Sequence, residues 1–240
     1  MKALILAAGV GTRFSRRLSE LPKCCALVGD RPLIRHTFNV LRSLGVNDIG
    51  LVTGYKDAEL LRHLDGLPFS TFRNPFFRVT NSIASMWFAL PFLAGHEDVL
   101  ILNADLYIEE EAVERLLACE HSPVFLADSS RIEAADYRFN WHDRRLLKSG
   151  KDLTDSETTG EYVGIAKVRA EHIHRINERL SLLIHQGQYD MWWEDALYSF
   201  INDDTLPLFV EDISVLFWAE LDFVEDYYRV QEHVTACHNP

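Results

Sequence analysis

Short apolar runs that alternate with helix-like segments are the feature that most limits the fold of this chain. Four runs have the length of buried strands, and they span residues 3–7, 49–53, 99–103 and 124–127. Apolar residues at helical spacing lie between and after them, in segments 32–44, 58–64, 81–93 and 110–119. Alternation of this kind is typical of βαβ units, so we expect an α/β protein with a three-layer α/β/α, Rossmann-like architecture and a mostly parallel mixed sheet.

The second half of the chain is less regular. Residues 137–148 predict a strand, a turn at His142-Asp143 and a second strand, and the polar segment 149–160 predicts a mobile flap. Order is expected to resume with a strand at 162–168 and helices at 171–185, 192–201 and 224–234. No internal repeat or Pro/Gly-rich linker divides the chain, so we expect a single domain over residues 1–240.

Charge and cysteine content restrict the partners and the compartment. The formal net charge of -12 in 240 residues disfavours general binding to nucleic acid or anionic membrane, because an acidic surface repels polyphosphate. The four cysteines lack metal-ligand spacing and are expected to be reduced. No apolar run approaches the roughly 18 residues of a membrane span. These features predict a cytosolic protein whose phosphate chemistry, if any, depends on a local basic cluster.

The segment LAAGVGTRF, residues 6–14, follows the first apolar run. A dinucleotide fingerprint would need glycine where Phe14 stands, and a Walker A loop would need Gly-Lys-Ser/Thr, so both interpretations fail. A glycine-rich turn remains, in which Gly9 and Gly11 let backbone N–H groups surround phosphate oxygens and Arg13 adds a permanent charge. On its own residues, the segment is equally consistent with an ordinary tight turn.

The downstream residues favour the phosphate cradle. Arg16, Arg17 and Lys23 form the densest early basic cluster, and the stretch LAAGVGTRF...LPKCCALV resembles the signature of nucleotidyltransferases that activate sugar phosphates and related compounds. LVTGYKD, NPFF with TNSIASMW, ILNADLYI, GEYVGIAKV and AELDFVEDY follow in the family's order. The chain is most similar to small CTP-dependent cytidylyltransferases of the choline-phosphate and 2-aminoethylphosphonate type. It departs from them at Arg16-Arg17-Leu18, where the family often has Pro-Leu-Thr.

This resemblance implies a nucleotidyltransferase fold with a nucleotide-binding half at about 1–130 and an acceptor-binding half at about 131–240. It implies that Arg13 and Lys23 are catalytic and stabilise charge on the reacting phosphate. Mg²⁺ is implied as the cofactor, with Asp105 and Asp222 as its ligands. The implied nucleotide-binding residues are Leu6, Ala8, Gly9, Gly11, Thr12, Arg13, Asn81, Ser85 and Asp105. Two roles have a purely structural alternative, since Asn81 can cap a helix and Asp105 can cap a turn.

The implied acceptor-binding residues are Tyr137, Lys167, Trp192, Glu194 and Glu220. In the choline-phosphate branch, two aromatic residues and a carboxylate surround a quaternary ammonium, and cation-π attraction suits that arrangement. Aromatic residues at helical spacing are also common core residues, which is the alternative for Trp192. Lys167, which interrupts an apolar strand, is the preferred ligand of the acceptor phosphate or phosphonate, and Arg138 is the other candidate.

The expected activity is transfer of CMP from CTP to a small phosphate or phosphonate, with release of pyrophosphate and dependence on Mg²⁺. Two alternatives remain open from the sequence: a sugar-1-phosphate nucleotidyltransferase that uses another NTP, and a catalytically silent homologue that binds nucleotide and regulates a partner. The expected partners are CTP and a small phospho- or phosphono-compound, without nucleic acid or membrane. Sequence does not determine the oligomeric state.

Overall fold

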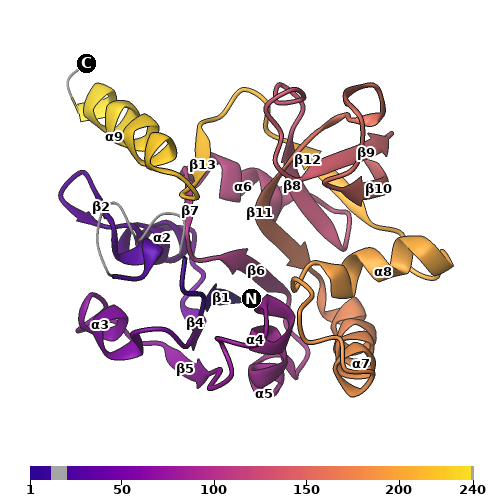
Figure 1. The fold of residues 1–240 in the computed structure, drawn as a ribbon, viewed down its shortest axis with the longest axis horizontal. Coiled ribbons are helices and arrows are strands. Elements are labelled where there is room, and N and C mark those ends of the chain that lie inside the picture. Colours follow the sequence, from indigo (N-terminus) through magenta and orange to yellow (C-terminus); the bar gives the residue numbers. More distant parts are fainter. Residues whose placement is uncertain (12–20, 239–240) are drawn as a thin grey trace.

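A computed structural model describes residues 1–11 and 21–238 of the chain (Figure 1). Within these residues, the main sheet has nine strands in the order β5-β4-β1-β6-β11-β8-β12-β10-β9. Their bounds are β1 Lys2–Ala7, β4 Asp48–Thr53, β5 Ser70–Arg73, β6 Val99–Asn103, β8 Val124–Asp128, β9 Arg138–His142, β10 Arg145–Gly150, β11 Gly160–Val168 and β12 Phe209–Asp212. Two small sheets pair β2 (Leu27–Val28) with β3 (Arg31–Pro32) and β7 (Leu106–Ile108) with β13 (Trp218–Glu220).

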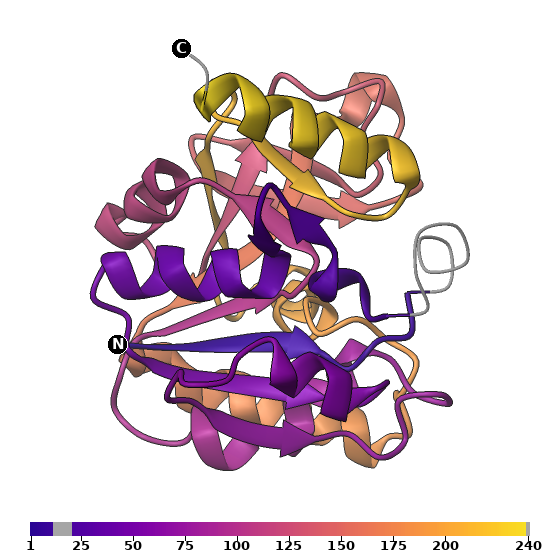
Figure 2. The ribbon, with the colours of Figure 1, turned by 90° about the vertical axis from the view of Figure 1, so that its left-hand side faces the viewer.

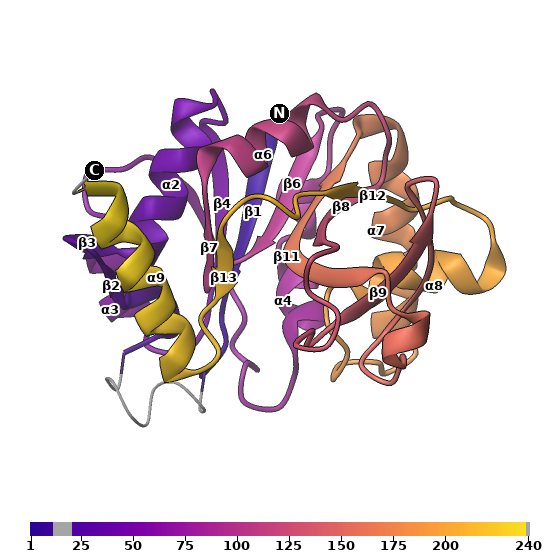
Figure 3. The same ribbon diagram turned by 90° about the horizontal axis from the view of Figure 1, so that it is seen from above.

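Helices cover both faces of the main sheet (Figures 2 and 3). One face packs on α2 (Leu33–Ser43), α3 (Asp57–Arg62) and α6 (Glu110–Ala118), and the other on α4 (Ser82–Phe88), α5 (Leu90–Leu93), α7 (Ala170–His185) and α8 (Asp195–Asp203). Strand β1 shows why, because its alternate side chains enter different cores: Ala3 and Ile5 join α2, α3 and α6, whereas Leu4 and Leu6 join the opposite layer. The three-layer α/β/α architecture expected from the sequence is confirmed.

The sheet changes character along its width. The pairs β5-β4, β4-β1 and β1-β6 are parallel, whereas β11 runs antiparallel to both β6 and β8. Beyond β8, the parallel neighbour β12 is followed by antiparallel β10 and β9, and β9 pairs a second time with β11. The mixed sheet is therefore parallel in the part formed by the first half of the chain and mainly antiparallel in the rest.

Most of the predicted elements are present with shifts of one or two residues at their ends. The expected helix 81–93 is two helices, because Pro91 lies at the start of α5 and cannot continue the hydrogen bonding of α4. The expected turn lies at Asp143 and Arg144, which both have positive φ as a tight hairpin requires. Strands β5, β7, β12 and β13 were not predicted from the sequence.

The segment 149–160 differs from the predicted mobile flap. Strand β10 continues to Gly150, and a short 3₁₀ helix, η2 (Asp155–Glu157), carries a capping box between Thr154 and Glu157. Arg138 forms an ion pair with Asp155 and also donates to Thr158. This polar segment is therefore structured by local hydrogen bonds rather than by apolar burial.

The C-terminal helix α9 (Val224–His238) packs against β2 and β13 through a third core that includes Val230 and Leu221. This packing places α9 beside β2, which is far from it in the sequence (Figure 3). The four cysteines are free thiols, of which only Cys237 is exposed. In the described part of the chain, no helix combines the length and apolar character that crossing a bilayer would require.

Candidate active site

A pocket of about 460 Å³ opens where β1 and β6 end, and it extends across the sheet to β13, α8 and the hairpin β9-β10. Ligands of α/β sheets bind at the carboxyl ends of parallel strands, and this pocket has that position. The predicted site residues that line it are Leu6, Ala8, Gly9, Gly11, Lys23, Asn81, Ser85, Asp105, Tyr137, Trp192, Glu194, Glu220 and Asp222. Thr12 and Arg13 lie outside the described residues, as do Arg16 and Arg17.

The glycine loop positions Lys23. Gly11 has a φ of +61°, which side-chain-bearing residues rarely adopt, and a Cβ there would lie 2.6 Å from Cγ of Lys23. Lys23 itself begins the short 3₁₀ helix η1 (Lys23–Cys25), whose Cys24 and Cys25 are buried. Glycine at position 11 is therefore required both by the backbone turn and by the lysine that packs across it.

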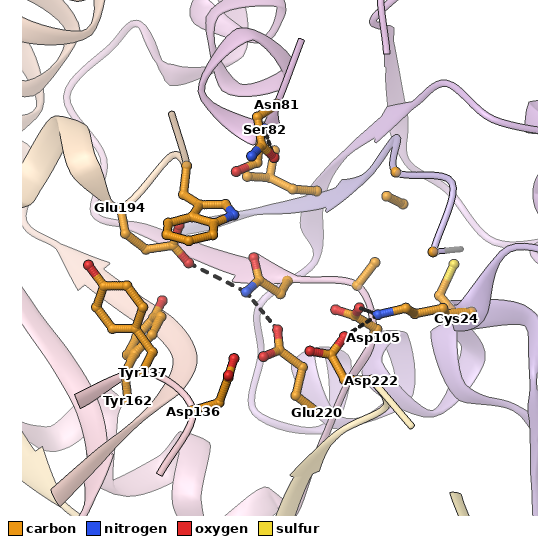
Figure 4. A pocket seen from close by; sticks show the side chains of 18 of the residues that line it. Cys24, Asn81, Ser82, Asp105, Asp136, Tyr137, Tyr162, Glu194, Glu220 and Asp222 are labelled. Carbon is orange, nitrogen blue, oxygen red and sulfur yellow. Dashed lines mark hydrogen bonds and ion pairs between the residues drawn. The ribbon is translucent and has the colours of Figure 1, made fainter. Parts of the chain in front are cut away.

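Asp105 and Asp222 meet at this lysine. Asp105 follows β6, and Asp222 follows β13, which pairs antiparallel with β7 in a register that places Glu220 opposite Leu106. The backbone N–H of Leu221 donates to the carbonyl of Asp105 at 2.9 Å, which fixes the two segments side by side. Lys23 Nζ lies 3.1 Å from Asp105 Oδ2 and forms an ion pair with Asp222 Oδ1 (Figure 4). The small β7-β13 sheet thus joins two aspartates that are far apart in the sequence.

The charges around Lys23 determine its protonation state. Burial lowers the pKa of Lys23, but the charges of Asp105 and Asp222 and the hydrogen bonds to them raise it more, so its pKa lies above the usual value. Lys23 is therefore an ammonium at neutral pH and acts as a charge donor rather than a base.

The two aspartates suit a divalent cation. Both carboxylates reach a single ammonium nitrogen, so their oxygens converge on one point, and both side chains retain some exposure, 24% for Asp105 and 19% for Asp222. Mg²⁺ prefers one or two carboxylate ligands, with water and substrate phosphates completing its shell. Asp105 and Asp222 could hold Mg²⁺ in this way, with Lys23 moving to an adjacent phosphate.

Asn81 and Ser85 line the pocket but already have structural partners. Asn81 is the N-cap of α4: its Oδ1 accepts from the N–H of Ser82 at 2.8 Å, and its Nδ2 donates to the carbonyl of Asp190. Ser85 is buried, and its hydroxyl accepts from Asn74 at 3.0 Å. The capping role is therefore present for Asn81, and contact of either side chain with a nucleotide stays a prediction.

The other end of the pocket contains two carboxyl groups held by one amide, of which Glu194 is buried and Glu220 is partly buried. Asn103 Nδ2 lies 2.9 Å from Glu220 Oε1 and 3.4 Å from Glu194 Oε1, and Asn103 Oδ1 accepts from the indole of Trp193 at 2.8 Å. Gly164 lies next to this amide with a φ of +101°, a backbone conformation that side-chain-bearing residues rarely adopt. In the view of Figure 4, Glu220 lies between Asp222 and the Glu194 end of the pocket.

Burial controls the ionisation of both glutamates. It raises the pKa of Glu194 to about 8, with a further contribution from the charge of Asp195. Burial also raises the pKa of Glu220, and the nearby charges of Asp105 and Asp222 raise it further. A cation that enters this end of the pocket would lower both pKa values and recover the charge that burial suppresses.

Aromatic rings border the two glutamates. Tyr137 and Trp192 meet edge to face with ring centroids 5.8 Å apart, and the Tyr162 ring lies beside Tyr137. Trp192 is 42% exposed, which the core alternative does not predict, because Trp193 is the tryptophan that is fully buried. The amine of Lys151 lies 5.3 Å from the centre of the Trp192 ring, so a cation of the protein already occupies one face of that ring.

The structure contradicts the expectation that Lys167 faces the acceptor. Lys167 is 3% exposed, and its amine donates to the carbonyls of Leu117 and Cys119, on the layer that contains α6. The lysine interrupts an apolar strand because it satisfies the last carbonyls of that helix. Arg138, the other candidate, turns to Asp155 and Thr158 and does not line the pocket.

Several pocket residues were missed by the sequence interpretation. They are Asn103, Arg131, Asp136, Lys151, Glu161, Tyr162, Asp226 and Arg229. A sequence signal existed for Asn103, a polar residue at the end of an apolar strand and two positions before Asp105. The others lie on loops, on β11 or on α9, where periodicity does not indicate which side chains share a cavity.

Comparison with known proteins agrees with this geometry. The model of the MobA-like NTP transferase domain matches residues 3–180. A CMP-5'-(3-aminopropyl)phosphonate synthase of Streptomyces rubellomurinus is 28% identical over 92% of this chain, which spans only 37% of that protein. A CTP:phosphoglutamine cytidylyltransferase of Campylobacter jejuni is 25% identical over 94% of this chain and 97% of its own.

Solved structures agree on the fold. The CTP:phosphocholine cytidylyltransferase of Streptococcus pneumoniae superposes with a TM-score of 0.77 at 23% identity, covering 97% of this chain and 98% of that one. The family match covers most of the chain, from β1 into α7, and includes the glycine loop, Lys23 and Asp105. The chain therefore belongs to the MobA-like NTP transferase domain family and is a nucleotidyltransferase.

Proposed function

We propose that this protein transfers a cytidylyl group from CTP to a small phosphate or phosphonate with a cationic head group, releasing pyrophosphate with the help of Mg²⁺. The observation that carries the proposal is one pocket in which Lys23 contacts Asp105 and Asp222 at one end, while the buried Glu194 and the partly buried Glu220 lie at the other. The first group suits a metal-bound triphosphate, and the second suits a positively charged acceptor. The relatives that act on phosphocholine, phosphoglutamine or an aminophosphonate support this choice of acceptor class.

The reaction needs little from the protein beyond position and charge. An oxygen of the acceptor phosphate or phosphonate attacks the α-phosphorus of CTP; a new P–O–P bond forms as the bond to the β-phosphate breaks and pyrophosphate leaves. The attacking oxygen is already anionic, so no general base is required. Lys23, an ammonium throughout, neutralises charge that develops on the transferred phosphate, and Gly9 and Gly11 admit the triphosphate to the backbone N–H groups of their loop. Mg²⁺ held by Asp105 and Asp222 would supply further neutralisation of the phosphates when bound.

At the acceptor end, the head group would lie among Glu194, Glu220, Tyr137 and Trp192. The carboxylates would balance its positive charge, and the ring faces would add cation-π attraction worth about 0.5–2 kcal/mol. The hydrogen bonds from Asn103 fix the two carboxylates, so the head group would be oriented with its phosphorus directed toward Asp222.

The test is a pyrophosphate-release assay with Mg²⁺, each of the four common NTPs and a panel of acceptors. The panel contains phosphocholine, phosphoethanolamine, 2-aminoethylphosphonate and several sugar 1-phosphates, and Asp222→Asn protein serves as the inactive control. We expect release with CTP and one or more of the cationic acceptors. Release with sugar phosphates alone would refute the proposed acceptor class, and binding of nucleotide without release for any pair would favour a catalytically silent role.

A further inference from the structure

Two arginines from distant parts of the chain contact Trp218 in the same pocket. Arg131 follows β8, and its guanidinium carbon lies 4.7 Å from the centre of the Trp218 ring. Arg229 is on α9, and its Nη2 donates to the carbonyl of Trp218 at 3.4 Å. Trp218 and Glu220 are alternate residues of β13, so both arginines lie near the end of the pocket that contains Glu220, and Arg229 is one turn of α9 from Asp226. Neither was predicted from the sequence.

Three of the four described cationic side chains in the pocket have a close carboxylate partner. In the described part of the chain, four cationic side chains line the pocket: Lys23, Arg131, Lys151 and Arg229. Lys23 contacts two aspartates, Lys151 donates to Asp136 at 2.7 Å, and Arg131 Nε lies 2.8 Å from Glu161.

Within the part of the chain that the structure describes, the guanidinium group of Arg229 has a more distant ion-pair partner and fewer hydrogen bonds than its donors allow. Its nearest carboxylate is Asp226 at 3.8 Å, and among the described residues its buried Nε has no hydrogen-bond partner. Burial lowers the pKa of Arg229, and repulsion by the positive charge of Arg131 lowers it further. Buried donors without acceptors and adjacent like charges are both unfavourable, and an oxyanion between the two groups would relieve both.

The proposed reaction supplies such an anion. The acceptor carries a phosphate or phosphonate, and this negative group must approach a triphosphate beside two aspartates. Lys23 offsets part of that repulsion but is shared with the nucleotide. We propose that Arg131 and Arg229 bind an oxyanion of the acceptor, while Glu194 and Glu220 face its cationic end. This inference rests on the proposed function, and it assigns the negative and the positive group of the acceptor to different residues of the pocket.

The oxyanion has two possible sources with the same chemistry: the attacking phospho group, or a carboxylate elsewhere on the acceptor. Phosphoethanolamine has only the first, and O-phosphoserine has both, so the two acceptors distinguish the sources. The variants are Arg229→Gln and Arg229→Lys, and the matched control is Arg145→Gln, which removes a half-exposed arginine paired with Asp204 on the surface. Because loss of Arg131 alone would leave Glu161 buried without its partner, Arg131 is tested as Arg131→Gln with Glu161→Gln, against Glu161→Gln alone.

Steady-state pyrophosphate release gives KM and kcat, and calorimetry gives CTP and acceptor binding directly. We expect Arg229→Gln to raise the acceptor KM about 10- to 100-fold, as loss of a charged hydrogen bond does, with partial recovery in Arg229→Lys and CTP binding unchanged. An equal effect on both acceptors identifies the phospho group, and an effect on O-phosphoserine alone identifies the carboxylate. An acceptor KM within twofold of the wild-type value for both acceptors, in both the Arg229 and the Arg131 variants, would overturn the inference.

Failure of the proposed function would look different, because the wild-type protein would then release no pyrophosphate with any acceptor. Calorimetry would still decide the inference in that case. Binding of O-phosphoserine or phosphoethanolamine that weakens at least tenfold in Arg229→Gln supports it, and binding that is absent in the wild-type protein or equal in the variant refutes it.

Discussion

Glu194→Gln provides a direct test of the electrostatics of the acceptor end. The carboxyl group of Glu194 is buried, and burial raises its pKa from the ordinary value of 4.5 to about 8. Between these two pH values the folded protein holds a proton that the unfolded chain releases. The free energy of unfolding therefore falls as pH rises, by about 1.4 kcal/mol per pH unit, and the loss is absent below pH 4.5 and complete above about pH 8.

Glutamine keeps the size and polarity of the neutral acid and has no proton to lose. The stability of Glu194→Gln relative to the wild-type protein should therefore rise with pH, by up to about 4 kcal/mol between pH 5 and pH 8. Urea denaturation at several pH values measures this difference, and Glu114→Gln, an exposed change on α6, is the matched control that should show no such trend.

A stability difference that stays constant within about 1 kcal/mol from pH 5 to pH 9 would refute the argument, because it would mean that Glu194 titrates alike in the folded and unfolded states. The protonation state of Glu194 also affects binding of the proposed acceptor. A neutral Glu194 must release its proton when a cationic head group arrives, so the pH dependence of stability and the recognition of the acceptor depend on one group.

Four further predictions concern the rest of the pocket. Asp222→Asn should lower turnover by about 100-fold or more while far-UV circular dichroism stays unchanged, because a carboxylate at the reacting phosphates is lost; turnover within threefold of the wild-type rate would contradict its role. Gly11→Ala should cost about 1–2 kcal/mol of stability from positive φ and lower turnover by displacing Lys23, measured by thermal unfolding and pyrophosphate release; unchanged values of both would show that the loop adapts. Trp192→Ala should raise the acceptor KM about 3- to 30-fold with CTP binding unchanged, as loss of a cation-π contact predicts, and an effect on CTP binding alone would assign Trp192 elsewhere. Lys167→Met should lower stability, since two carbonyls lose their donor, yet leave the acceptor KM within twofold; a large rise in that KM would restore the sequence-based role.

The half of the chain that is expected to bind nucleotide was largely predictable in structure, because its candidate site residues follow the ends of buried strands. A buried parallel strand positions the residues that come directly after it, so the positions of Gly9, Gly11 and Asp105 followed from the apolar runs alone. The parallel strands β1, β4 and β6 have near-continuous apolar sequences, which is the signal that periodicity detects best. The resemblance to nucleotidyltransferases then supplied Asp222, whose proximity to Asp105 depends on a three-residue pairing between β7 and β13 that is too short to predict.

The acceptor-binding half was predictable only in part, for a physical reason. Its strands are mainly antiparallel and several are connected by polar loops, so the register that decides which side chains face the pocket is set by tertiary contacts. Lys167 illustrates the failure. A lysine within an apolar strand needs a partner, but the sequence does not show whether that partner is a substrate phosphate or, as here, the carbonyl groups at the end of a neighbouring helix.

Asn103 links the two halves in a way that constrains how acceptor preference can change. It ends β6, two residues before Asp105, so its backbone is fixed by the strand that also positions this proposed metal ligand. Its side chain bonds Glu220, Glu194 and the buried indole of Trp193, and these groups come from β13 and the segment before α8. Substitution of Asn103 would leave buried polar groups unpaired, at a cost of about 1–3 kcal/mol for each. Residues such as Lys151 and Trp192, at the more exposed rim, carry no such penalty, and we infer that acceptor preference in this fold changes there first.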